Sequence, residues 1–110
     1  MEITITHKKL KKCANEYKKL RKEFGDKRAK KIKSRLDDMR AADSLEDLRH
    51  APGRYHALTG DRQGQWACDL DHPYRLIFEP HEQPPPTDEQ GTVLWVEIYG
   101  VEIVDIADYH

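Results

Sequence analysis

The chain has 110 residues, of which 37% are hydrophobic and 35% are charged, and its formal net charge is −1. This length suits one small domain, and the composition is typical of a soluble globular protein. No run approaches the roughly 18 apolar residues of a membrane span, and the Lys-rich segment after Glu2 lacks the apolar core of a signal peptide. We therefore expect a single cytoplasmic domain over residues 1–110.

The charges are divided unevenly along the chain. Residues 1–54 hold 17 of the 19 lysines and arginines against nine acids, a net of +8. Residues 55–110 hold two arginines against 11 acids, a net of −9. This asymmetry favours a basic element that meets a polyanion or an acidic partner, although the two halves could also neutralise each other after folding.

The two cysteines indicate no metal site. Cys13 and Cys68 match no metal-ligand spacing and could form at most one bridge. Without an export signal, we expect both to be reduced and buried, as small hydrophobic residues of a cytosolic protein.

The first half has the pattern of a short strand and two helices. Residues 3–6 form a β-branched run, which favours a strand. From Lys8 onwards, apolar residues recur at spacings of three and four, which predicts a single amphipathic helix. Its apolar stripe consists of Leu10, Cys13, Tyr17, Leu20 and Phe24.

A second helix is predicted after a short break. Gly25 is typical of a helix end, and Asp26 is a candidate N-cap for the next helix. The second apolar stripe consists of Ala29, Ile32, Leu36 and Met39. So short a connection predicts an antiparallel helical hairpin. Residues 44–48 then favour an N-capped turn of helix, and residues 51–53 end the helical half.

The second half has the pattern of strands and turns. Three runs of β-rich composition, at 54–58, 65–70 and 74–79, are separated by turn residues and predict an antiparallel meander. Residues 80–91 hold four of the six prolines and predict an extended, mobile hairpin loop. The rest of the chain predicts one long final strand, bent or bulged at Gly100.

The order of these elements defines the expected fold class. A short strand and a helical hairpin precede an antiparallel sheet, which predicts an α+β domain of two layers. The helical hairpin should cover one face of the sheet, so the other face is free to form a site.

The residues that could carry chemistry lie in the strand half. The sequence has no Gly-rich phosphate loop, no His-x-x-x-His and no Cys-x-x-Cys, so we predict neither a cofactor nor a metal. The polar residues that stand out are His56, Asp61, Arg62, Arg75, Asp108, Tyr109 and His110.

Each of these residues also has a purely structural interpretation. Arg75 interrupts an apolar strand, so it must be exposed, paired with a carboxylate or bound to an anion. His56 alone is more typical of a surface histidine than of a catalyst, and the last three residues alone are typical of a solvated tail. Trp66 and Trp95 are expected in the core or at its rim.

Taken together, these residue types suit the metal-independent cleavage of RNA. Attack of a 2′-hydroxyl on its own phosphate needs a proton acceptor, a proton donor to the leaving 5′-oxygen, and cations for the phosphate. Histidines can serve as base and acid, and arginine can hold a phosphate bidentately. A carboxylate can orient an imidazole, and tyrosine can stack on a base or donate a hydrogen bond.

The segment "YHALTGDRQGQWACDLDHPYRLIFEP" and the terminal "VDIADYH" resemble the RelE/ParE superfamily, and within it the HigB-type toxins of bacterial type II toxin–antitoxin systems. The resemblance covers residues 50–110, whereas the N-terminal helices agree in organisation only. It implies a RelE-like fold and a ribosome-dependent mRNA endonuclease that inhibits translation. It also implies neutralisation by a HigA-type helix-turn-helix antitoxin, which alone would contact operator DNA.

The resemblance also implies roles for individual residues. His56 matches the histidine of the catalytic pocket, and Arg75 matches the arginine that contacts the scissile phosphate. Asp108, Tyr109 and His110 match the C-terminal catalytic cluster, with His110 expected to transfer a proton, Asp108 to orient it and Tyr109 to place the nucleotide. The resemblance does not decide which imidazole is the base.

One position departs from the family pattern. Many relatives have lysine where this chain has Thr59, and Arg62 could replace that cation only if its turn folds inward. Two alternatives therefore stay open. One is a ParE-like gyrase inhibitor, which would not need both His56 and His110. The other is a nuclease-dead module of the same fold that binds RNA or protein through its basic half.

Overall fold

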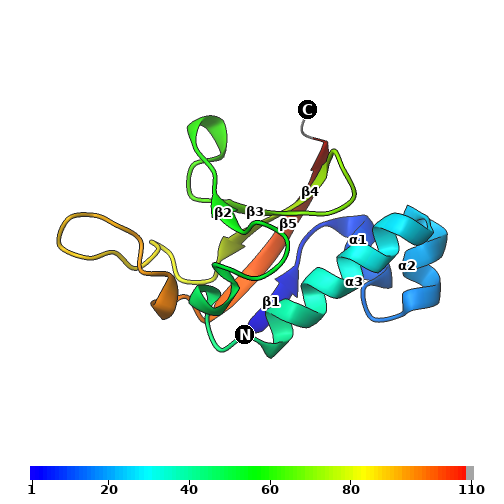
Figure 1. Cartoon of the computed structure of the whole chain (residues 1–110), viewed down its shortest axis with the longest axis horizontal. Coiled ribbons are helices and arrows are strands. Elements are labelled where there is room, and N and C mark those ends of the chain that lie inside the picture. The colour runs from blue at the N-terminus through cyan, green and yellow to red at the C-terminus, as the bar shows by residue number, and fades with distance from the viewer. Residues whose placement is uncertain (109–110) are drawn as a thin grey trace.

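The computed structural model describes residues 1–108, and in it three helices lie to one side of a twisted sheet (Figure 1). The element bounds are β1 Glu2–Ile5, α1 Lys8–Cys13, α2 Tyr17–Phe24, α3 Asp26–Ala41, β2 His56–Ala57, β3 Trp66–Asp69, β4 Tyr74–Pro80 and β5 Gly100–Asp108. Short 3₁₀ turns occupy Leu45–Leu48, Gly60–Arg62 and Trp95–Glu97. No helix in the described part of the chain is long and apolar enough to cross a membrane.

The five-stranded sheet has the order β1-β5-β4-β3-β2. Strands β2 to β5 are antiparallel neighbours, which confirms the predicted meander. Strand β1 joins the edge parallel to β5, so the sheet is mixed rather than wholly antiparallel. The α+β class is confirmed, with the N-terminal strand a member of the sheet.

The prediction of a single helix from Lys8 to Phe24 is wrong, because this segment forms two helices. Helix α1 ends at Cys13 and α2 begins at Tyr17, so the chain bends over residues 14–16. Asn15 lies in the bend, and asparagine favours such breaks because its side chain competes for backbone hydrogen bonds. The apolar spacing continues across the bend, but Tyr17 is 39% exposed.

The predicted second helix is confirmed as α3, and its whole apolar stripe is buried. Its start differs from the prediction: the N-cap is Gly25, whose φ is +83°, and Asp26 is the first helical residue. Asp26 accepts a hydrogen bond of 2.8 Å from Arg21, and that bond, with the nearby positive charge, lowers the pKa of the Asp26 carboxyl. Helices α2 and α3 form the expected hairpin. Ser44 precedes the 3₁₀ turn at Leu45–Leu48 but makes no side-chain capping bond.

The final strand is shorter than predicted. Strand β5 begins at Gly100, and the segment before it includes the Trp95–Glu97 turn. Trp95 lies edge-on to buried Trp66, with 6.1 Å between ring centroids, which explains why this apolar segment turns instead of extending the sheet. The predicted irregularity at Gly100 is also misplaced, because the register shift leaves Val104 unpaired between Ile103 and Asp105.

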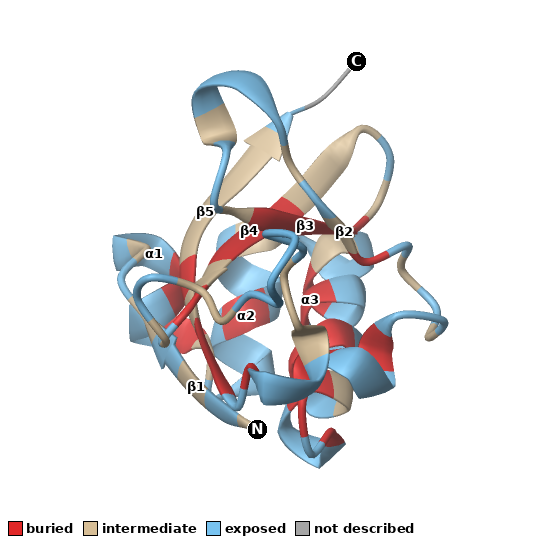
Figure 2. Ribbon diagram, turned by 90° about the vertical axis from the view of Figure 1, so that its left-hand side faces the viewer, coloured by how far each residue is buried: buried red, intermediate tan, exposed pale blue. Residues whose placement is uncertain are grey.

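The two faces of the sheet have different environments. The inner face packs on the helices through buried residues such as Trp66, Cys68, Phe78 and Ile103, and Figure 2 shows this buried layer in red. Side chains alternate along a strand and cross-strand partners share a face. The outer face therefore carries His56, Ala67, Asp69, Arg75, Ile77 and, beyond the bulge, Asp105.

Candidate functional site

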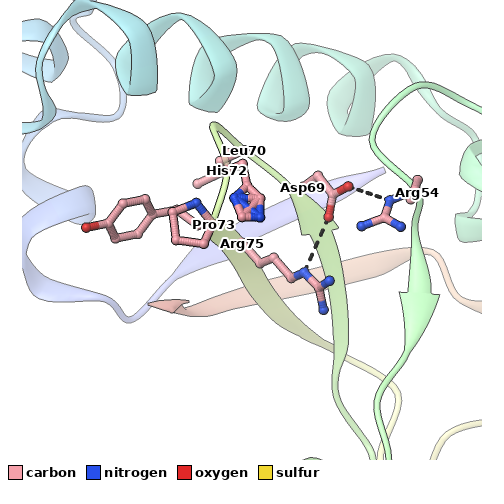
Figure 3. Close-up of a pocket in the computed structure, with 7 residues that line it drawn as sticks. Arg54, Asp69, Leu70, His72, Pro73 and Arg75 are labelled. Atoms are coloured by element: carbon pink, nitrogen blue, oxygen red, sulfur yellow. Dashed lines mark hydrogen bonds and ion pairs between the residues drawn. The ribbon is translucent and has the colours of Figure 1, made fainter. Parts of the chain in front are cut away.

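Asp69 lies at the centre of the candidate site, between two arginines (Figure 3). Asp69 of β3 and Arg75 of β4 are cross-strand partners, and their ion pair joins Arg75 Nε to Asp69 Oδ1 at 3.4 Å. On the other side, Arg54 Nε donates a 2.5 Å hydrogen bond to Asp69 Oδ2. This bond and the carboxylate charge raise the pKa of the Arg54 guanidinium. One carboxylate therefore holds two guanidinium groups on the same patch of the sheet.

A small hollow adjoins this cluster. Its volume is about 60 Å³. Arg54, Asp69, His72 and Arg75 supply its polar lining, and Leu70, Pro73 and Tyr74 complete the wall. The sequence singled out Arg75 in this set but missed Arg54, Asp69 and His72.

His56 is tied to the same cluster through the backbone. Its Nδ1 lies 2.6 Å from the carbonyl oxygen of Arg54. A carbonyl can only accept, so in the neutral imidazole Nδ1 carries the proton and Nε2 is the proton acceptor. His56 and Asp69 are diagonal neighbours on the outer face of β2 and β3, which places their Cα atoms roughly 7–8 Å apart.

Arg54 adopts an uncommon backbone conformation. Its φ is +49°, and no other non-glycine residue of the described chain has a positive φ. The left-handed conformation costs about 1–2 kcal/mol for a residue with a β-carbon. In this conformation the Arg54 carbonyl is bonded to His56 and the Arg54 side chain is bonded to Asp69.

The turn that holds Thr59 and Arg62 folds over the outer face. Arg62 Nη2 donates a 2.7 Å hydrogen bond to Asp105 Oδ2 on β5, and Arg62 Nη1 donates one of 3.0 Å to Gln65. These two bonds hold the Arg62 guanidinium over the outer face of the sheet. Thr59 is exposed at the start of this turn and makes no side-chain capping bond.

The C-terminal residues are only partly described. Asp108 is exposed at the end of β5, where it is the register partner of Tyr74, next to the Arg75–Ala107 pair. It therefore lies at the same end of the sheet as Arg75, but on the opposite face, which it shares with Tyr74. Tyr109 and His110, predicted as members of the catalytic cluster, lie outside the described residues.

A buried arginine lies beneath the site. Arg35 of α3 is only 7% exposed, and its Nε donates a 2.7 Å hydrogen bond to the carbonyl oxygen of Asp69. The N–H group of Asp69 donates at 2.7 Å to the carbonyl of Gly53. A β-carbon at Gly53 would lie 2.6 Å from Arg35 Nε, so glycine is needed where the guanidinium passes.

Two neighbouring buried groups, Cys68 and Tyr55, stay protonated at neutral pH. Burial raises the pKa of the Cys68 thiol to about 12, and burial also raises the pKa of the Tyr55 hydroxyl. Both cysteines are free and buried, as predicted. Among residues 1–108, no group of three or more histidine, cysteine, aspartate or glutamate side chains could hold a metal ion.

Solved structures of low sequence identity share this fold. A YoeB/ParE toxin from Agrobacterium tumefaciens matches with a TM-score of 0.60 and 12% identity, covering 100% of both chains. A chain of a YoeB–YefM complex from Staphylococcus aureus matches with a TM-score of 0.55 and 17% identity, covering 100% of this chain and 97% of that one. A YoeB dimer from the same organism matches with a TM-score of 0.54, 18% identity and the same coverage. The chain therefore shares its fold with these YoeB/ParE and YoeB structures.

The sequence itself gives the family. The model described as "RelE-like toxin of type II toxin-antitoxin system HigB" matches residues 4–84, well over half of the chain. The chain belongs to this family of toxins. The comparison with curated proteins gives no match. The matched segment contains His56, Thr59, Arg62 and Arg75 and ends before β5.

Proposed function

We propose that this toxin is an endoribonuclease that cuts mRNA on the ribosome and thereby inhibits translation in the cytoplasm. The observation that carries the proposal is the outer face of the sheet, where His56 lies beside the Arg54–Asp69–Arg75 cluster. A proton acceptor next to two guanidinium groups suits the attack of a 2′-hydroxyl on a phosphate.

The reaction uses His56 as the base. Nε2 of His56 takes the proton from the 2′-hydroxyl, because Nδ1 is engaged with the Arg54 carbonyl. The 2′-oxygen then attacks the phosphorus, while Arg75 balances the charge that builds up on the phosphate oxygens. The bond from phosphorus to the 5′-oxygen breaks, which leaves a 2′,3′-cyclic phosphate and a 5′-hydroxyl. By the family resemblance, His110 protonates the leaving 5′-oxygen, Asp108 orients it, and Tyr109 places the nucleotide.

The basic half supplies attachment to the ribosome. The net charge of +8 in residues 1–54 suits salt-dependent, sequence-independent binding to ribosomal RNA. The same charge suits an acidic segment of a HigA-type antitoxin, and two of the matched structures are YoeB–YefM complexes. Arg62, held over the outer face by Asp105, takes the place of the missing lysine at Thr59.

The test is induction of the wild-type chain and of variants in growing bacteria. The wild type should arrest growth and create new 5′ ends within translated messages. His56→Ala and Arg75→Ala should relieve the arrest, with cleavage lowered about 10²–10⁴-fold for the loss of the base. Arg49→Ala serves as the control, because Arg49 lies outside the site and pairs with Glu46.

Three outcomes would count against the proposal. Growth arrest without new 5′ ends in messages would favour the ParE-like gyrase inhibitor. Binding to ribosomes without arrest or cleavage would favour the nuclease-dead module. Full toxicity of His56→Ala and Arg75→Ala would show that these residues are not the catalytic site.

A further inference from the structure

Asp69 is held through its backbone N–H, its backbone carbonyl and both of its carboxylate oxygens. Its N–H and C=O groups are bonded to Gly53 and Arg35, each at 2.7 Å. Its two carboxylate oxygens contact Arg54 and Arg75 separately, at 2.5 Å and 3.4 Å. A carboxylate held in this way from both backbone and side chain is a rigid reference point for the arginines around it.

The support comes from the helical layer. Arg35 projects from α3 and is buried, and burial of a charged side chain is costly unless it is well bonded. Its passage requires Gly53 in a conformation with φ of +114°. Arg35 bonds the Asp69 carbonyl from the helical side of the sheet, so α3 holds the backbone of Asp69 in place.

We propose that Asp69 is the positioning residue of a two-arginine phosphate site, in which Arg54 and Arg75 together bind one phosphate group of RNA at the hollow lined by His72. Both arginines contact Asp69 through Nε, so the planes of their guanidinium groups are set by the two oxygens of one carboxylate. The inference rests on the proposed function only in naming RNA as the source of the phosphate.

Because Asp69 is negatively charged, its positioning role can be tested by whether its neutralisation weakens or strengthens anion binding. By Coulomb's law alone, removing a negative charge beside an anion site strengthens anion binding. Loss of a positioning group does the opposite, because the guanidinium groups are no longer held together. Asp69→Asn removes the charge with little change of shape, so the direction of its effect separates the two possibilities.

The experiment is a titration with inorganic phosphate, followed through the Nε–Hε NMR signals of Arg54 and Arg75. In the wild-type protein both signals should shift together with one dissociation constant. Asp69→Asn should weaken phosphate binding about tenfold, the scale of losing one charged hydrogen bond. Asp69→Glu, which keeps the carboxylate, should retain affinity within about twofold.

The matched control is Asp71→Asn, two residues after Asp69, just beyond the end of β3. Asp71 is paired with Arg28, at 3.1 Å and 3.3 Å, and does not line the hollow. This variant should bind phosphate as tightly as the wild type or more tightly. Thermal melting of each variant checks that it is folded.

The result that would overturn the proposal is Asp69→Asn binding phosphate as tightly as the wild type or more tightly. Wild-type protein whose Arg54 and Arg75 signals do not respond to phosphate would also overturn it. Neither result depends on nuclease activity. The proposed function is judged separately, by the mapping of message 5′ ends.

Discussion

Arg54 combines an unfavourable backbone with two contacts in the site. Glycine adopts a φ of +49° without penalty, whereas alanine does not. We expect Arg54→Gly to be more stable to urea than Arg54→Ala by about 1 kcal/mol, since both lose the same side chain. Arg49 is the control position, because its φ is −54° and alanine should there be the more stable substitution. Equal stability of the two Arg54 variants would show that the backbone is not strained.

Cys68 should make the protein sensitive to alkali. Its pKa is raised from 9.0 to about 12 because burial disfavours the thiolate, so the folded state holds the proton more tightly than the unfolded state. The stabilisation is complete below pH 9 and is lost as pH rises from 9 towards 12. The free energy of unfolding should therefore fall less steeply above pH 9 in Cys68→Ala than in the wild type. Parallel curves would contradict this.

At the scale of residues, the sequence indicated which side chains matter only where they break a pattern. Arg75 stands out because it interrupts an apolar strand. Asp69 does not, because 11 acids share residues 55–110 and only the register of β3 and β4 shows which one faces Arg75. The bond from His56 to Arg54 depends on a backbone dihedral that no local pattern encodes.

At the scale of elements, Gly53 links helix α3 to the sheet. A β-carbon there would lie 2.6 Å from Arg35 Nε, in addition to the strain of a positive φ. Gly53→Ala should therefore lower the free energy of unfolding by about 2–3 kcal/mol. Gly91→Ala is the matched control: its φ is +84° with nothing within 4 Å, so it should cost only about 1 kcal/mol. If urea unfolding shows the same loss of stability for both variants, the contact with Arg35 adds nothing to the cost of Gly53→Ala.

Periodicity predicted most elements but not where they end. The α1–α2 bend was missed because apolar residues keep helical spacing across it, so the stripe gives no sign of the break. The start of β5 was missed because residues 93–96 are apolar, and it is the contact of Trp95 with Trp66 that turns them. The second error arises from tertiary packing, which local patterns do not contain.

At the scale of the whole molecule, four of the 11 lysines line a groove between α1 and α2. The groove is lined by Lys9, Lys12, Cys13, Lys19, Lys22 and Glu23, and its volume is about 540 Å³. Replacing Lys12, Lys19 and Lys22 with glutamine should reduce the salt dependence of ribosome binding, by roughly 0.7–0.9 in the log–log slope for each phosphate that is no longer neutralised. Sedimentation with ribosomes at several salt concentrations measures this slope.

The control removes the same charge elsewhere. Glutamine at Lys27, Lys30 and Lys31 of α3 lowers the net charge equally but leaves the groove intact. If both triple variants have the same slope, attachment depends on net charge alone and not on the groove.

The unpaired Val104 has a consequence for how this toxin is compared with its relatives. Before it, odd-numbered residues of β5 pack against the helices, and after it odd-numbered residues such as Asp105 share the face of Arg75. In a relative that lacks the residue equivalent to Val104, the side chains that face the site after the bulge would come one position earlier in the sequence. In the last strand, an insertion or deletion thus changes which side chains reach the site, whereas a gapless alignment would pair outward residues with inward ones.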